Sequence, residues 1–212
     1  KLKMQLNATG NGFDIFNART AYDVDITVDT IQYAGYNLHS INAKASQDGC
    51  ISQVNIDGQD KKLFFGIDAT TRLAPTGIKN RTSIELTNAD FKEIGLVDST
   101  LQISTNIDIA AKTDFKETHS LKVAGAGTTI ATGKYRFTPA DLSLNFATSP
   151  TMTSIEVENG DLNIDGEMDC GYNGLFAALQ EIATMNSNMM SGKTDLYHLH
   201  DYEEVLPRIS LD

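Results

Sequence analysis

Apolar and polar residues alternate with a period of two along most of this chain. That period is typical of an extended strand with one face turned away from water. The clearest run lies at 101–112, where five apolar residues at odd positions oppose five polar residues at even positions. Similar runs lie at 22–28 and 63–73, and shorter ones at 2–6, 54–56, 84–86, 121–123, 135–137, 142–146 and 155–157. Each run predicts a strand with one buried face.

Turn-forming residues separate these runs and set the expected topology. They lie at 57–58, 75–77, 125–127, 132–133, Pro139 and Pro150, with the Gly125–Gly127 stretch expected as a hairpin turn. No helical period intervenes between successive runs, which argues against βαβ units and favours an antiparallel meander. The predicted fold is mainly β, either an elongated curled sheet forming an open trough or a β-sandwich, because alternation looks the same in both.

Two segments depart from the strand period. Apolar residues recur at helical spacing from Gly174 to Met190, which predicts one amphipathic helix covering an end or a face of the sheet. A short helical turn is expected at 88–95, with Asn88 as its cap and Gly95 as its end. Residues 9–21 read as loop.

Length and charge narrow the possible functions. The chain has 212 residues, 41% of them hydrophobic, and no linker divides it, so we expect a single module over 1–212. A net charge of -11 and the lack of a local Lys/Arg cluster argue against nucleic-acid binding. No apolar run reaches the length of a membrane span. The chain opens on Lys1 and closes on an alternating stretch, which predicts a piece of a longer protein.

Two segments carry potential metal ligands, and neither has a complete set. Residues 161–166 match the first half of a calcium loop, but Tyr172 occupies the position of the bidentate Glu, and the apolar Leu162 and Ile164 favour a strand. The polar residues at alternate positions from Asp161 to Asp169, four of them acidic, are expected to line an exposed face and to oppose edge association. His198 and His200 lack a third strong ligand at the usual spacing, which favours a polar strand end. His39 and His119 are expected at the surface.

Motifs for nucleophilic catalysis and phosphate binding are missing from the sequence. We therefore expect no enzyme, no cofactor and no catalytic residue. Cys50 and Cys170 are far apart in sequence, which leaves one disulfide possible, although the apolar phase of Cys170 favours a buried free thiol.

Several phrases in residues 84–212 resemble the TamB-like proteins of the AsmA-like superfamily. The segment 86–96, followed by the strand at 101–109, resembles that family's short helical turn with a following strand that ends in Asp, with Phe91 and Ile94 in place of two leucines. The stretch 160–166, the helix after it and the closing 206–211 resemble the family's repeated strands and associated helix.

The resemblance implies a periplasmic segment of a protein anchored in the inner membrane of a Gram-negative cell. Its partners would be phospholipid acyl chains and, through the parent chain, an outer-membrane β-barrel assembly protein of the Omp85 type. Its function would be lipid transport and outer-membrane biogenesis along an apolar β-groove. The groove candidates are Leu63, Phe65, Ile67, Leu101, Ile103, Ile107, Ile109, Leu142, Leu144 and Phe146.

The same alternation is compatible with filling a closed core, so a β-sandwich adhesin or carbohydrate-binding module is the alternative. Sugar-binding surfaces favour exposed aromatic rings. This chain has no Trp, 7 Tyr and 9 Phe, and most of the Phe residues fall in the inward phase. The composition therefore favours the lipid-binding hypothesis over the carbohydrate-binding one.

Overall fold

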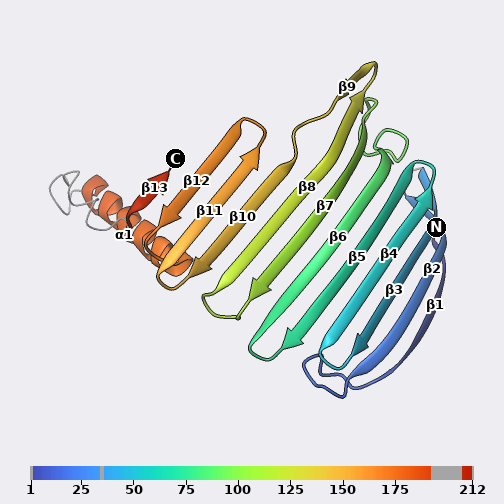
Figure 1. Cartoon of the computed structure of the whole chain (residues 1–212), viewed down its shortest axis with the longest axis horizontal. Helices are drawn as coiled ribbons and strands as arrows, with labels where there is room; N and C mark the ends of the chain where they lie inside the picture. The colour runs from blue at the N-terminus through green and yellow to red at the C-terminus, as the bar shows by residue number, and fades with distance from the viewer. Residues whose placement is uncertain (1, 34–35, 192–206, 212) are drawn as a thin grey trace.

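The computed structural model describes residues 2–33, 36–191 and 207–211, and within these it is one antiparallel sheet with a single helix (Figure 1). Most strands span eight to fourteen residues. In chain order they are β1 (Leu2–Asn11), β2 (Ala21–Tyr33), β3 (Tyr36–Asp48), β4 (Ile51–Asp60), β5 (Leu63–Ala74), β6 (Gly77–Asp90), β7 (Gln102–Thr113), β8 (His119–Thr132), β9 (Tyr135–Phe137), β10 (Leu142–Ser149), β11 (Met152–Asn159), β12 (Leu162–Met168) and β13 (Ile209–Leu211).

Apart from the short β9, the strands pair in chain order, each antiparallel to the next. The sheet runs from β1 to β8, continues with β10 to β12 and ends on β13, while the short β9 pairs with β8. No second sheet covers this one in the described part of the chain. The expected antiparallel meander is confirmed, and of the two predicted architectures the open trough is the one observed.

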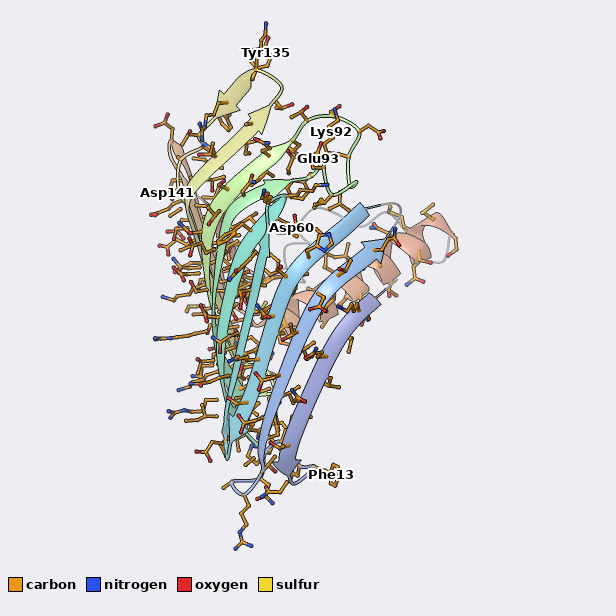
Figure 2. The ribbon with its side chains drawn as sticks, turned by 90° about the vertical axis from the view of Figure 1, so that its right-hand side faces the viewer. Phe13, Asp60, Lys92, Glu93, Tyr135 and Asp141 are labelled. Atoms are coloured by element: carbon orange, nitrogen blue, oxygen red, sulfur yellow. The ribbon has the colours of Figure 1, made fainter. Side chains whose placement is uncertain are left out.

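The sheet is curled along its strand order. Figure 2 shows it from the side of β1, with β1 to β3 bending toward the side on which the helix lies. Strands twist with a fixed hand, and a single sheet of this many strands curls when nothing packs against it. The curl gives the molecule a concave and a convex face.

Strand register separates apolar from polar residues onto these two faces. Successive strand neighbours place apolar side chains directly opposite one another, in one row from β1 to β7: Leu6, Ile26, Ala43, Ile56, Ile67, Ile84 and Ile107. The residues next to these in sequence form polar rows on the opposite face. Cross-strand pairs of this kind are the unit of sheet stabilisation, at roughly 0.2–1 kcal/mol each.

Little of the chain is enclosed. The accessible surface is 14385 Å², whereas a compact monomer of this mass exposes about 9,700 Å². Among the described apolar side chains only Val28, Leu73, Ala89, Ala178 and Met185 are buried. The apolar rows shield one another sideways and leave their outer surface open.

The helix α1 (Tyr172–Met190) matches the prediction and begins two residues earlier than expected. Its first turn is fixed to the hairpin ends of the sheet: the Tyr172 hydroxyl donates to the Lys116 carbonyl at 3.0 Å, and Asn173 Nδ2 donates to Glu117 at 3.0 Å. Ala178 and Met185 are buried, while Phe176 and Leu179 stay exposed. The helix therefore lies at one end of the sheet and leaves part of its apolar surface uncovered.

Two predicted turns are in fact inside strands. Gly58 lies within β4, opposite Phe65 of β5, whose ring occupies the space that a Cβ at Gly58 would need. Gly127 lies within β8 at a φ of 62°, where the register to β7 shifts between Ser104 and Asn106. Glycine allows the close contact at residue 58 and the bulge at residue 127. From sequence alone, both positions look like turns.

The predicted helical turn at 88–95 is shorter than expected and has a different cap. The strand β6 continues through Asn88 to Asp90, and the turn covers 91–95. Asp90 Oδ1 accepts from the Glu93 amide at 3.0 Å, and Gly95 ends the turn at a φ of 78°. Gln102 Nε2 donates to Asp90 Oδ2 at 2.8 Å, and this bond together with the Glu93 amide lowers the pKa of Asp90. Of residues 9–21, predicted as loop, 9–11 belong to β1 and Ala21 begins β2.

Candidate functional site

The groove candidates come together on the apolar face. Nine of them lie in β5, β7 and β10, and Leu101 directly precedes β7. Ile67 and Ile107 flank Ile84 of β6 in direct register, and Val123 of β8 joins Ile109 to Leu144. Leu142 is 38% exposed and the others are half-buried. These side chains form a continuous surface that no described residue covers completely.

Residues outside the predicted set extend this surface in both directions. Ile26, Ile56 and Ile84 continue the row toward β1, and Val157 and Ile164 continue it to β12. Leu2 and Leu6 on the first strand are 59% and 55% exposed. The same alternation that identified the other candidates marks these positions, so the sequence carried the signal for them.

At one end of the concave face, the row of side chains on β2 to β6 is polar. On the face that carries Ala45 and Val54, the row nearest the 12–20 loop consists of Tyr22, Gln47, Ser52, Thr71 and Asn80. Asn80 Nδ2 donates to Thr71 Oγ1 at 2.9 Å, and the Tyr22 and Ser52 hydroxyls are 3.4 Å apart. Toward β8 and β10 the same row becomes apolar with Leu121 and Phe146.

The loop at 12–20 covers this end of the trough. Gln47 Nε2 donates to the Ile15 carbonyl at 2.8 Å and to the Gly49 carbonyl at 2.7 Å. Phe16 lies against Phe115 of the β7–β8 loop, with ring centroids 6.0 Å apart and planes at 83°. One loop follows β1 and the other follows β7, which are far apart in the strand order. Their contact therefore spans this end of the trough. Phe13, at the tip of the loop, points away from the molecule (Figure 2).

The convex face is polar and its charges are sorted by strand. Acidic residues dominate β11 and β12, where Glu156 pairs with Asp165 and Ser154 with Glu167. Basic residues gather on β5 to β8. Lys3 and Asp29 form an ion pair at 2.7 Å near the other edge of the sheet. The predicted exposed acidic face of residues 161–169 is confirmed for the part that lies in β12.

The segments with potential metal ligands have separate outcomes. Residues 162–166 are extended in β12, as the strand interpretation predicted, so neighbouring side chains point to opposite faces. His198 and His200 lie outside the described residues. Where the structure describes the chain, no three His, Cys, Asp or Glu side chains gather into a potential metal site.

The described histidines and cysteines do not form a reactive centre together. His39 is exposed, whereas His119 is half-buried, with Nδ1 2.8 Å from Thr113 Oγ1 and its ring against Tyr172. Cys50 and Cys170 are both free thiols and both half-buried, so the expected burial of Cys170 is only partial. Desolvation raises the pKa of the Cys170 thiol, and the neighbouring Asp169 raises it further.

Comparison with protein-family models, with curated proteins and with solved structures gave no match to this chain. Among the helices of the described residues, none combines the length and the apolar character that a membrane span requires.

Proposed function

We propose that this chain is a non-enzymatic segment of a TamB/AsmA-like envelope protein that shields phospholipid acyl chains on its concave face. The observation that carries the proposal is the open, continuous apolar surface from β1 to β12, which no described residue covers completely. Phospholipid transport toward the outer membrane, a periplasmic location and an Omp85-type partner of the parent chain belong to the same proposal.

The chemistry of the concave face fits an alkyl chain. Its central rows consist mainly of aliphatic side chains and contain no charged residue in the register from Leu6 to Ile107. An alkyl chain needs no directional contact, and complete burial contributes ~0.8 kcal/mol per CH₂. An open trough covers only one side of an alkyl chain, so each methylene gains less than it would from complete burial. Several methylenes must therefore lie along the trough together. The long rows of this sheet provide that length.

The extent of the exposed apolar surface indicates that this face binds an apolar molecule. Soluble monomers rarely expose apolar patches larger than a few hundred Å². Here the exposed apolar side chains include Leu2 and Leu6 at one edge of the sheet and Leu142, Ile155 and Leu162 toward the other. Acyl chains lying across these strands would remove that surface from water.

Native mass spectrometry of the purified chain, combined with lipid extraction and titration with a fluorescent fatty acid, tests the proposal. We expect co-purified phospholipid and uptake of the fatty acid. The double substitution Ile67→Asp with Ile107→Asp places two charges on either side of Ile84 on the concave face. It should reduce fatty-acid affinity by roughly tenfold or more, because a buried carboxylate is costly.

The control substitutions are Gln5→Asp with Gln53→Asp, which add the same charge on the exposed polar face of β1 and β4. They should leave fatty-acid binding unchanged. Circular dichroism establishes that both variants are folded. A chain that contains no lipid and takes up no fatty acid contradicts the proposal. Binding to glycans on an array, without lipid binding, would favour the carbohydrate-binding alternative.

A further inference from the structure

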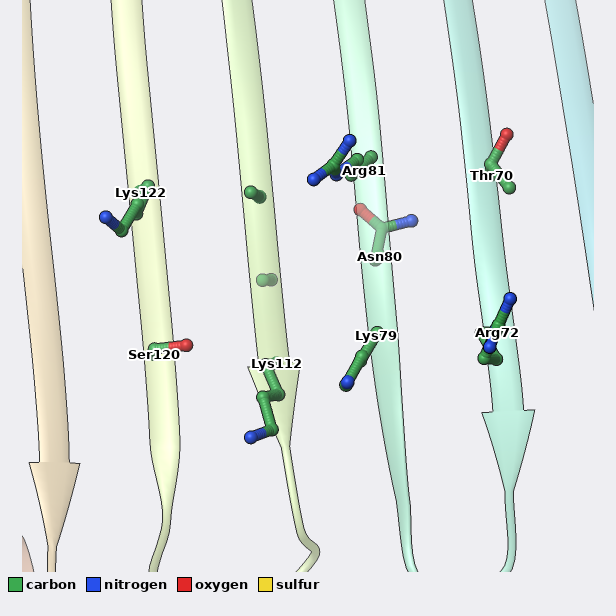
Figure 3. Close-up of a pocket in the computed structure, with 10 residues that line it drawn as sticks. Thr70, Arg72, Lys79, Asn80, Arg81, Lys112, Ser120 and Lys122 are labelled. Carbon is green, nitrogen blue, oxygen red and sulfur yellow. The ribbon is translucent and has the colours of Figure 1, made fainter.

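Five cationic side chains surround one shallow hollow on the convex face. The hollow has a volume of about 630 Å³ and is lined by Arg72, Lys79, Arg81, Lys112 and Lys122 together with small and polar residues (Figure 3). These five come from β5, β6, β7 and β8, so no stretch of sequence shows them as a cluster. All five are exposed.

The register places like charges directly opposite one another. Arg72 pairs with Lys79, and Lys79 pairs with Lys112, so three cations stand side by side on neighbouring strands. Like charges in directly opposite positions destabilise a sheet. The chain has 28 Asp and Glu against 17 Lys and Arg, so acidic partners are not scarce in its composition.

None of the five cations forms an ion pair with an acidic side chain that the structure describes. The described ion pairs join Lys3 to Asp29, Lys44 to Asp25 and Lys62 to Glu93. Asp68 and Asp108 lie beside Ser83 in the next row of the same face, two residues along their strands, and form no ion pair with the five cations. The cations are therefore available to an anion from outside the chain.

The centre of the hollow has room for such an anion. Ala110 of β7 lies directly between Arg81 and Lys122, so a short side chain forms the floor between two cations. Ser120 pairs with Lys112 and supplies a hydroxyl beside it. Ammonium and guanidinium groups around a small floor residue, with a hydroxyl donor beside them, suit oxygen atoms of phosphate.

The acidic strands limit the size of the ligand. Glu156, Asp165 and Glu167 on β11 and β12 border the neighbouring hollow of the same face, which also contains Ser120 and Lys122. The basic area spans four strands, or about 14 Å at the usual strand spacing. A bilayer surface or a nucleic acid would extend beyond it and meet these carboxylates, whereas a compact anion would not.

We propose that this basic hollow binds a compact ligand carrying two or more phosphate groups. The ligand is either a soluble polyphosphate compound or the phosphorylated headgroup of a lipid. This site lies on the face opposite to the proposed acyl-chain surface and does not depend on it.

Calorimetric titration with tripolyphosphate tests this proposal. We expect saturable binding that weakens with added salt. Lys79→Gln with Lys112→Gln should reduce the affinity by roughly tenfold or more, since charge-assisted contacts to phosphate are strong. The matched control is Lys3→Gln with Lys44→Gln, which removes the same charge from lysines that are paired with Asp29 and Asp25. It should change the affinity by less than about twofold.

Two further arms identify the source of the phosphate. A water-soluble short-chain diacylglycerol pyrophosphate that binds more tightly than tripolyphosphate supports a lipid headgroup, and equal affinity supports a soluble compound. Absence of tripolyphosphate binding overturns the proposal, and so does an equal loss in the two double variants. Binding only to vesicles that contain anionic lipid also overturns it, because the surface would then recognise a membrane.

Discussion

The concave and convex faces of the sheet are made by alternate residues of the same strands, yet they differ in kind. On the concave face, apolar side chains stand in direct register over many strands, so each residue is supported by its neighbours. On the convex face, β5 to β8 place cations beside cations. Side-chain pairing therefore stabilises the concave face, while part of the convex face keeps an electrostatic cost that a bound anion would reduce.

The largest expected effect comes from filling the space at Gly58 on the concave face. A side chain there meets the Phe65 ring directly. Gly58→Val should destabilise the fold by about 1–3 kcal/mol through overpacking. A shift of roughly 2–4 °C in Tm per kcal/mol is expected for a chain of this size.

Gly66 provides the control for this prediction, because a Cβ at Gly66 meets no atom within 4 Å. Gly66→Ala should be neutral or raise Tm slightly, since alanine reduces the entropy of the unfolded chain. Thermal unfolding followed by circular dichroism measures both variants. Equal effects of the two substitutions would show that the concave face is not the more tightly packed of the two.

The contact between the two loops at the end of the trough gives the next effect in size. Phe16→Ala and Phe115→Ala each remove the edge-to-face contact between the two loops. A double-mutant cycle should yield a coupling energy of about 0.5–1.5 kcal/mol, as is usual for aromatic pairs. Urea unfolding of the two single variants and the double variant measures it. Additive effects would show that the two loops do not support each other.

A smaller effect is expected where three cations stand side by side. Lys79 lies between Arg72 and Lys112, so Lys79→Gln should stabilise the ligand-free chain by about 0.2–1 kcal/mol. Lys44→Gln removes an exposed ion pair with Asp25 and should be neutral or slightly destabilising. Urea unfolding measures both variants, and a loss of stability in both would contradict the expected repulsion around Lys79.

The smallest effect is local and depends on pH. The Thr118 and Lys116 amides each donate to Asp114 Oδ1 at 2.9 Å, and these bonds lower the pKa of Asp114 from 3.8 to about 2. A lowered pKa means that this support of the β7–β8 loop is complete above 3.8 and is lost as the pH falls toward 2. The two amide resonances should titrate together near pH 2, and a midpoint near 3.8 would show that the bonds are not formed.

The sequence predicted much of the sheet and less of its details. Alternation at 63–73 and 101–112 identified β5 and β7 because their side-chain period matches the pleat. The same period could not distinguish an open trough from a sandwich, because that depends on whether a second layer covers the face. Gly58 and Gly127 were misread because glycine serves turns, bulges and close contacts alike.

The apolar surface could be predicted from the sequence, whereas the basic hollow could not. Ile67 and Ile107 were found because every apolar position of a strand with one buried face points the same way. Arg72 and Lys122 are fifty positions apart in the chain, and only the register of four strands brings them to one hollow. A one-residue change in any of these registers would move its side chains to the other face, so propensity alone contains no signal for this site.

The pairing of strands in chain order has a consequence for how such a molecule can change its size. From β1 to β7 each strand bonds only to its neighbours in sequence, so this part of the sheet resembles a one-dimensional array in which each unit is stabilised by the next. Removing or duplicating one hairpin, such as β3 with β4, would alter the span of the sheet by two strand spacings and would leave the remaining pairs in register. The reach of this architecture is therefore a quantity that insertion and deletion can adjust in steps.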